Sequence, residues 1–318
     1  MFGFYEKHFT IFGLDIAYYG LIIAIGMGLG VFLACKNAKF RGFKTDDIII
    51  LACYVLPFAI IGARIYYVLF SLNEFTSFWQ VFEIWKGGMA IYGGVIGGAI
   101  AIMLYCLIHK KNFLDVADVV VPSLILGQAI GRWGNFFNQE AYGYFIESSS
   151  ARWFPIGVYI EDCSQAICEC GGSGWHLATF FYESIWNLGV FVMLLLLLRK
   201  NKTHLRGSLM CLYFIGYGAG RIWIEGLRTD SLYLGSLRVS QFLSILLILF
   251  GIGFIIVNSI LYKKGKVKDL PSLKPYFETN LKTKKLKKVE EKAVEEKPIK
   301  PLEEEKVDKD KNPQDKQE

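Results

Sequence analysis

Two groups of charged and amide side chains in this sequence have the spacing of a phosphate site. Arg221 and Glu225 are four residues apart and therefore share one face of a helix, and Arg228 follows about one turn later. Arg132 and Asn135 lie three apart in an earlier apolar run. A guanidinium is a planar donor fork that suits phosphate, and a carboxylate one turn away can orient it. The pattern predicts a binding site for an anionic phosphate group.

Four further polar side chains occur in apolar surroundings: Tyr19, Arg64, Tyr92 and Glu183. An ionisable side chain inside an apolar span is costly and usually faces the interior of a helix bundle or a wet cavity. The alternative is that each arginine forms a structural ion pair or reaches the membrane interface. For Arg228 and Arg238 this alternative stays open.

The elements that must position these residues are apolar segments long enough to cross a membrane. The chain has 318 residues, of which 53% are hydrophobic, and a helix of about 20 apolar residues spans the hydrocarbon core. The sequence therefore predicts an all-α integral membrane protein with about seven transmembrane helices. The predicted spans are about 14–35, 46–70, 88–109, 115–135, 177–198, 207–226 and 239–262.

The loop charges predict the orientation of these spans. Lysine and arginine gather in alternate connections, from Lys36 to Lys44, at Lys110 and Lys111, from Arg199 to Arg206, and after Lys263. Basic loops stay in the cytoplasm, so the N-terminus is expected outside and the C-terminus in the cytoplasm. The long fourth connection, about 136–176, is acidic and falls outside. Because the net charge of +6 resides in loops and tail, it does not indicate nucleic-acid binding.

This topology brings the polar residues of six spans to one depth. Spans 2, 4 and 6 run outward and carry their arginines late, whereas spans 1, 3 and 5 run inward and carry Tyr19, Tyr92 and Glu183 early. The sequence therefore predicts a single cationic cavity that opens to the outer leaflet and suits a phospholipid headgroup.

Glycines mark close approaches of these helices. They crowd the third span at positions 87, 88, 93, 94, 97 and 98, and small residues at four-residue spacing let membrane helices pack backbone to backbone. Gly134 and Asn135 stand at the predicted end of the fourth span, where they predict a turn with positive φ.

The run from Gly127 to Gly143, GQAIGRWGNFFNQEAYG, resembles the signature of the prolipoprotein diacylglyceryl transferases. Other segments resemble the family's elements in the same order along the chain: Tyr18–Gly20, Gly62–Val68, Gly87–Gly94, Thr179–Ser184 and Arg221–Asp230. The resemblance covers about 12–262 and leaves out the tail.

The resemblance implies transfer of the diacylglyceryl group of phosphatidylglycerol to the lipobox cysteine thiol of prolipoprotein signal peptides. It implies a bacterial cytoplasmic (inner) membrane, contacts with membrane lipids, and chemistry that requires neither a metal nor an organic cofactor. The candidate catalytic residues are Arg132, Arg221, Glu225 and Tyr92. The candidate substrate-binding residues are Arg132, Asn135, Tyr19, Arg64, Tyr67, Gly143 and Arg228.

Two positions depart from the family pattern. Tyr92 stands where many members have a histidine that is a candidate base for the thiol, and a neutral phenol is a poor base at pH 7. Thiol activation could then come from Glu225 or from the cationic field of the site. The family's His-Pro-Thr stretch is altered to His176-Leu177-Ala178-Thr179.

The remaining segments leave several alternatives open. Residues 263–318 form a charged cytoplasmic tail that is expected to be disordered, with a basic first half that either contacts anionic lipid or is simply solvated. Cys163, Cys168 and Cys170 lie in the outside loop, where two could form a disulfide or all three could bind a metal with His176. The rival functions are a transporter or flippase of anionic lipids, which predicts inverted repeats, and a scaffold with structural ion pairs.

Overall fold

A computed structural model describes residues 7–11, 14–84, 87–161, 173–200, 205–229, 233–234 and 237–265, all within the compact unit Met1–Pro271. The predicted disordered tail, 263–318, lies outside the described residues from position 266 onward. The three cysteines of the outside loop, Cys163, Cys168 and Cys170, also lie outside them.

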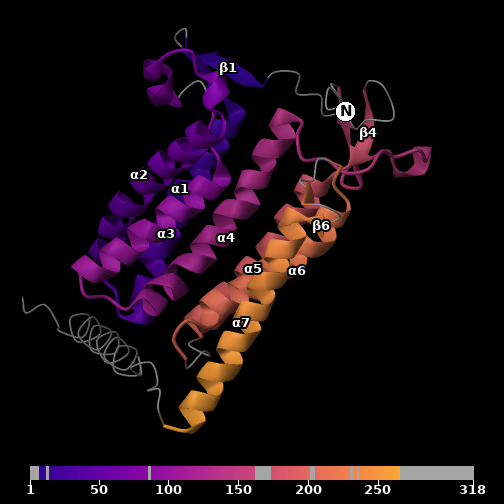
Figure 1. Cartoon of the computed structure of the whole chain (residues 1–318). Coiled ribbons are helices and arrows are strands. Elements are labelled where there is room, and N and C mark those ends of the chain that lie inside the picture. The colour runs from indigo at the N-terminus through magenta and orange to yellow at the C-terminus, as the bar shows by residue number, and fades with distance from the viewer. Residues whose placement is uncertain are drawn as a thin grey trace, which may run out of the picture. The chain divides into compact units, whose positions relative to one another are not determined.

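Each predicted span corresponds to one long helix in the described part of the chain (Figure 1). The helices are α1 (Tyr18–Asn37), α2 (Thr45–Phe70), α3 (Ile91–Ile108), α4 (Phe113–Asn138), α5 (Thr179–Arg199), α6 (Ser208–Gly226) and α7 (Val239–Lys263). Their ends lie within four residues of the predicted ends. Six of these described helices are long and apolar enough to cross a membrane, and α6, which carries Arg221 and Glu225, is not among the six. The exact number of crossings and their direction therefore stay predictions.

Short antiparallel strand pairs accompany the helices. They are β1 (His8–Ile11) with β2 (Leu14–Ala17), β3 (Gly157–Ile160) with β4 (Gly174–Leu177), and β5 (Tyr233–Leu234) with β6 (Leu237–Arg238). In Figure 1 the labelled strands lie at one end of the helices, the upper end in that view. The predicted topology assigns this end to the outside.

Close glycine contacts join α2 to α3, as the sequence predicts for the third span. A Cβ on Gly62 would lie 2.5 Å from the carbonyl oxygen of Gly93, and a Cβ on Gly97 would lie 2.2 Å from that of Phe58. Only glycine permits this backbone contact without displacement. The other main helix pairs are α1 with α4, α4 with α5, and α6 with α7. The helix α4 therefore packs against both α1 and α5.

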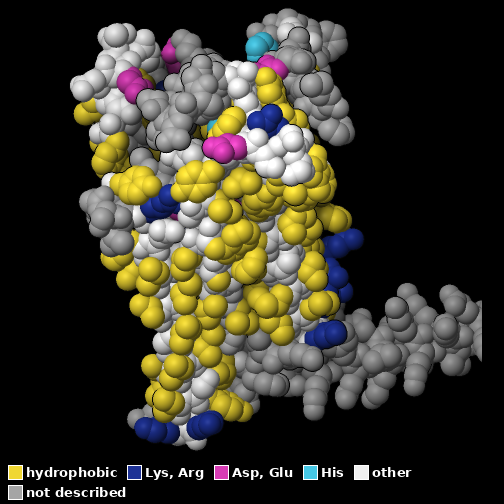
Figure 2. Space-filling view, turned by 90° about the vertical axis from the view of Figure 1, so that its right-hand side faces the viewer, with side chains coloured by type: hydrophobic (Ala, Val, Ile, Leu, Met, Phe, Trp, Pro, Cys, Tyr) yellow, Lys and Arg dark blue, Asp and Glu magenta, His cyan; other side chains and the backbone are white. Residues whose placement is uncertain are grey.

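The outer surface of the helices is apolar over most of its length. Figure 2 shows hydrophobic side chains over a broad band of one face, with the visible acidic side chains toward its upper end. Large apolar residues are exposed along the helices, among them Ile61, Leu69, Leu107 and Leu249, each at least 56% exposed. An apolar surface of this extent suits lipid rather than water.

The predicted turn at Gly134 and Asn135 is wrong. Both residues are inside α4, which continues to Asn138 and ends at Gln139 in the left-handed conformation with φ of 53°. The glycine is required for another reason, because a Cβ at Gly134 would lie 2.6 Å from Cδ2 of Tyr19. The glycine therefore admits an aromatic ring of α1 against α4.

A buried carboxylate of α4 fixes the start of α6. Asp118 accepts hydrogen bonds from the main-chain N–H groups of Gly207, Leu209 and Met210, each at 3.0 Å. Its Oδ2 also lies 3.3 Å from Nη2 of Arg41, and both side chains are almost fully buried. The first N–H groups of a helix have no partner within the helix, so Asp118 explains why α6 can begin in a buried position.

Candidate active site

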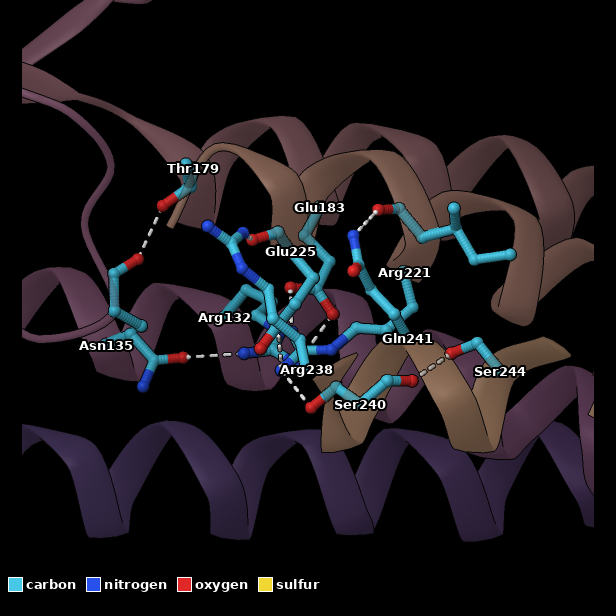
Figure 3. Close-up of polar contacts among 12 residues, drawn as sticks. Arg132, Asn135, Thr179, Glu183, Arg221, Glu225, Arg238, Ser240, Gln241 and Ser244 are labelled. Carbon is cyan, nitrogen blue, oxygen red and sulfur yellow. Dashed lines mark hydrogen bonds and ion pairs between the residues drawn. The ribbon is translucent and has the colours of Figure 1, made fainter. Parts of the chain in front are cut away.

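Four charged side chains from three helices form the centre of the candidate site (Figure 3). Glu183 of α5 bridges two arginines, with Oε1 2.6 Å from Nη2 of Arg132 on α4 and Oε2 3.0 Å from Nη1 of Arg221 on α6. Nη2 of Arg221 lies 2.7 Å from Oε2 of Glu225, four residues later on the same helix. Glu183 and Glu225 are buried, whereas the side chain of Arg132 keeps 20% of its surface exposed. The structure therefore brings together three predicted catalytic residues.

The second predicted phosphate ligand of α4 lies beside the first. Oδ1 of Asn135 accepts a 3.4 Å hydrogen bond from Nη1 of Arg132, and its Nδ2 donates to Oε1 of Glu140 at 2.8 Å. The same oxygen of Glu140 accepts a bond from Asn138 at 3.3 Å. Glu140 thus fixes the amide of Asn135 so that its oxygen faces the arginine.

Tyr19 approaches this group from α1. Its ring lies over Gly134, and its phenol is within electrostatic range of Arg132 and Glu140. The structure therefore places Tyr19 next to the predicted phosphate ligands of α4, as the sequence expects.

Tyr92 is the second residue of α3 and is 41% exposed, with its ring centroid 6.3 Å from that of Tyr66. Tyr217 of α6 lies within electrostatic range of Tyr92 and also of Glu183 and both arginines of the cluster. Tyr92 is thus near the charged cluster but separate from its ion pairs. Its assignment as a catalytic residue stays a prediction.

Arg64 and Tyr67 make their contacts elsewhere, with the connection between α2 and α3. Arg64 donates to four main-chain carbonyls at 2.6 to 2.8 Å, those of Gln80, Val81, Gly87 and Gly88. The phenol of Tyr67 donates a short hydrogen bond to Glu74. The guanidinium of Arg64 therefore binds the protein's own backbone, and its binding of a headgroup stays a prediction.

Gly143 lies where three backbone segments meet. Its N–H donates to the carbonyl of Leu177 at 2.9 Å, and it forms an isolated antiparallel bridge with Arg228. A Cβ at this position would lie 2.8 Å from Cβ of Leu177 and 2.8 Å from the carbonyl oxygen of Leu227. The close approach requires glycine, so the structure gives Gly143 a packing role and places Arg228 at the edge of the same junction.

His176 completes this junction. It is 2% exposed, and its Nδ1 lies 3.0 Å from the carbonyl oxygen of Gly143, to which it donates. Burial lowers the pKa of His176 below its ordinary value of 6.5, while the bond to the carbonyl acts in the opposite direction. Among the described residues there is no group of three histidine, cysteine or carboxylate side chains that could hold a metal ion.

The chain matches the prolipoprotein diacylglyceryl transferase family over residues 6–257. It is 47% identical over 246 residues to the phosphatidylglycerol–prolipoprotein diacylglyceryl transferase of Oceanobacillus iheyensis, covering 76% of this chain and 84% of that protein. It is 43% identical over 264 residues to transferase 1 of that name from Clostridium perfringens, covering 82% and 95%. The chain belongs to this family. The resemblance drawn from its motifs is therefore confirmed.

Several residues of the site carry roles that the sequence did not assign to them. The sequence predicts Glu183 among the polar residues of the site, but its bridging of two arginines depends on how α4, α5 and α6 face one another. Arg238 donates to the carbonyl of Glu225 and to the phenol of Tyr233, and so ties the start of α7 to the end of α6. An ionisable residue in an apolar span indicates a candidate site residue. The same pattern does not predict which groups that residue contacts.

Proposed function

We propose that this protein transfers the diacylglyceryl group of phosphatidylglycerol to the lipobox cysteine of prolipoproteins, which is the first step of bacterial lipoprotein maturation. The products are a thioether on the cysteine and free glycerol phosphate. The observation that carries the proposal for this site is the pair of arginines, Arg132 and Arg221, held 2.6 and 3.0 Å from one carboxylate inside an apolar helix bundle.

The proposed location is the bacterial cytoplasmic (inner) membrane, with the N-terminus outside, the charged tail in the cytoplasm, and residues 1–262 as the transferase domain. Apolar helices and basic loops support this placement. The cluster lies near the strand-bearing ends of α4 and α6, which that topology assigns to the outer half of the bilayer. Phosphatidylglycerol and a membrane-held signal peptide can both reach this depth.

In the proposed reaction, Arg132 and Arg221 bind the phosphate of phosphatidylglycerol, and the Asn135 side chain helps to hold the Arg132 fork. As the carbon–oxygen bond to the phosphate breaks, the leaving glycerol phosphate gains negative charge. Arg132, held by Asn135, and Arg221, held by Glu225, stabilise that charge with little reorganisation. The cysteine attacks as its thiolate, a form that a cationic site favours.

Tyr19 and Arg228 have positions that suit the headgroup. The phenol of Tyr19 lies within electrostatic range of Arg132, and Arg228 follows Glu225 at the end of α6. For Arg64, Tyr67 and Gly143 we propose supporting roles, because their contacts hold the α2–α3 connection and the backbone junction beside the site.

The test is an activity assay on purified protein in detergent with phosphatidylglycerol and a lipobox peptide. The readouts are the mass gain of the peptide and the release of glycerol phosphate. Arg132→Ala removes one preorganised charge donor and is expected to lower turnover by about 100-fold or more.

The matched control is Arg152→Ala, because Arg152 is exposed and donates only to carbonyls of its own loop, those of Ile146 and Glu147. It is expected to keep activity within a few-fold of the wild type. Full activity in Arg132→Ala would refute the proposed phosphate site, and a folded wild type that yields neither product would refute the proposed reaction.

A further inference from the structure

The carboxylate of Glu183 occupies the donor groups that a substrate phosphate needs. Its two oxygens lie 2.6 Å from Arg132 and 3.0 Å from Arg221, and its side chain is only 4% exposed. Two guanidinium and two carboxylate groups make this cluster neutral overall. An anion that bridges the arginines through these same groups, Nη2 of Arg132 and Nη1 of Arg221, displaces Glu183, because these two nitrogens are the ones that the carboxylate occupies.

Displacement changes the chemistry of Glu183. A buried carboxylate that loses its cationic partners keeps a costly charge, and accepting a proton removes that cost. Glu225 differs, since it pairs with Arg221 from the next turn of the same helix and does not bridge to Arg132. Glu140 differs too, because Asn135 and Asn138 hold it at the end of α4. Glu183 is thus the carboxylate that phosphate binding would release.

The proton that needs an acceptor is that of the substrate thiol. Many members of the family have a histidine at the position of Tyr92. The neutral phenol of a tyrosine is a poor base. We propose, on the basis of the proposed transferase reaction, that Glu183 is the general base of this enzyme and that it becomes available when the phosphate takes its place on Arg132 and Arg221.

The proposed step transfers one proton, forms one C–S bond and breaks one C–O bond. The cysteine S–H gives its proton to the carboxylate of Glu183, and the thiolate forms a C–S bond to the glyceryl carbon of the lipid. The C–O bond to the phosphate breaks, and its electron pair leaves with glycerol phosphate. When that product departs with the proton, Glu183 returns to the two arginines.

The charged and titratable groups that surround Glu183 come from several elements. Arg132 of α4 and Arg221 of α6 pair with it, and Glu225 of α6 shares Arg221. Tyr217 of α6 lies within electrostatic range of Glu183 and also of Tyr92 of α3. Of these, Tyr92 is the rival base. Replacement of each candidate by a side chain of similar shape, Glu183→Gln and Tyr92→Phe, separates the two.

The experiment compares lipobox peptides that carry cysteine or selenocysteine as the acceptor. A selenol is already ionised at neutral pH and needs no base, so it bypasses proton removal but not phosphate binding. With the cysteine peptide, Glu183→Gln is expected to lose about 100-fold in turnover. With the selenocysteine peptide it is expected to return to within about 10-fold of the wild type, whereas Tyr92→Phe stays near wild type with both peptides.

Two results would overturn the proposal. Equal loss with both peptides would make Glu183 a structural or phosphate-positioning residue, and a Tyr92→Phe defect that selenocysteine rescues would make Tyr92 the base. Arg132→Ala serves as the control that selenocysteine does not rescue. A wild type that releases no glycerol phosphate with either peptide would instead overturn the proposed function itself.

A second measurement needs no variant and covers the case in which Glu183→Gln does not fold. The wild-type rate with the cysteine peptide is expected to depend on pH, because the thiol must lose its proton to react. It is expected to be lower at acidic pH. The selenocysteine peptide is expected to lack that fall in the same range. Identical pH profiles for the two peptides would contradict a general base of any kind in this step.

Discussion

The guanidinium groups of Arg64 and Arg132 have different partners in the structure, although the sequence predicts that both arginines, each in an apolar helix, bind the substrate. Arg132 faces the carboxylate of Glu183 and keeps part of its surface exposed. Arg64 is 8% exposed and donates to four carbonyls of the α2–α3 connection. A guanidinium whose donors already hold carbonyls would have to release them to bind a headgroup. We therefore expect Arg64 to act on the stability of the connection.

Arg64→Lys tests this expectation. An ammonium is a compact donor that cannot reproduce the fork, so several of these partly buried carbonyls lose their partner, at a cost of about 1 kcal/mol each. The variant is expected to unfold at lower temperature in detergent and to be cleaved faster by protease between α2 and α3. The Michaelis constant for phosphatidylglycerol is expected to stay close to the wild-type value, while the unfolding temperature falls.

Arg152→Lys is the matched control, because Arg152 also donates to carbonyls but is exposed. Its thermal unfolding should stay close to that of the wild type. A raised Michaelis constant in Arg64→Lys with unchanged stability would show instead that Arg64 binds the headgroup.

The sequence could predict which residues lie at the site but not which groups they contact. Arginines and a glutamate in apolar runs indicated that these side chains share one site, and Arg132, Glu183 and Arg221 do meet. The bridge through Glu183 depends on the rotation of three helices about their axes, and the partners of Arg64 depend on the path of a connection with no periodic pattern. Contacts of this kind are determined by tertiary packing, which the spacing of residues along the sequence does not reveal.

At the scale of elements, the junction of Gly143 with β4 joins the connection between α4 and α5 to the start of α5 and the end of α6. The N–H of Gly143 donates to Leu177, that of Leu177 donates to Tyr144, and that of Tyr144 donates to Leu227. His176 closes the junction from within through its bond to the carbonyl of Gly143. Metal binding by His176 with Cys163, Cys168 and Cys170 stays an open alternative, because the three cysteines lie outside the described residues.

The stability of this junction is expected to depend on pH. Burial lowers the pKa of His176 below its ordinary 6.5, so the folded junction binds fewer protons than the unfolded one near that pH. Its stability therefore rises with pH, is fully present above about 6.5, and is lost as pH falls through 6.5 toward the lowered pKa. Hydrogen exchange of the Gly143 and Leu177 amides, corrected for intrinsic exchange, is expected to speed up below pH 6.5.

His176→Asn supplies the control for this pH effect. An asparagine amide can donate to the carbonyl of Gly143 but does not titrate, so the dependence between pH 5 and 7 is expected to disappear. If the corrected exchange of these amides changes equally with pH in the wild type and in His176→Asn, another group is responsible.

The glycine contacts between α2 and α3 were predictable for a physical reason. Glycines at four-residue spacing in an apolar span have few other uses, and Gly93 and Gly97 do meet backbone atoms of α2. The turn expected at Gly134 failed because glycine also serves to admit a side chain, here the ring of Tyr19. Local spacing therefore identifies a close approach but not what approaches.

At the scale of the whole bundle, polar contacts occur near both ends of α4 and α6. Arg132 and Arg221 meet at Glu183 toward one end. At the other end Asp118 accepts the first N–H groups of α6 and pairs with Arg41, while Asn37 of α1 accepts a 3.2 Å bond from Arg199 of α5. Because Asp118 joins the two helices that carry the arginines, it fixes their relative position along the bundle.

Asp118→Asn tests this anchor. The amide leaves Arg41 buried beside an uncharged group and turns an N–H donor toward the helix start, so stability is expected to fall by about 3 kcal/mol. Turnover should fall with it, since α6 carries Arg221. The measurements are thermal unfolding in detergent and hydrogen exchange at the amides of Leu209 and Met210.

Asp115→Asn is the matched change one turn earlier on α4. Asp115 lies 3.4 Å from Arg206, and their side chains are 14% and 35% exposed, so this pair is less buried than that of Asp118 with Arg41 and its loss is expected to cost less. Exchange at the start of α6 should therefore stay near the wild-type rate in Asp115→Asn and rise only in Asp118→Asn. Equal effects of the two variants would mean that general charge balance at this end of the bundle, rather than the bonds from Asp118 to α6, holds the arginine-bearing helices in place.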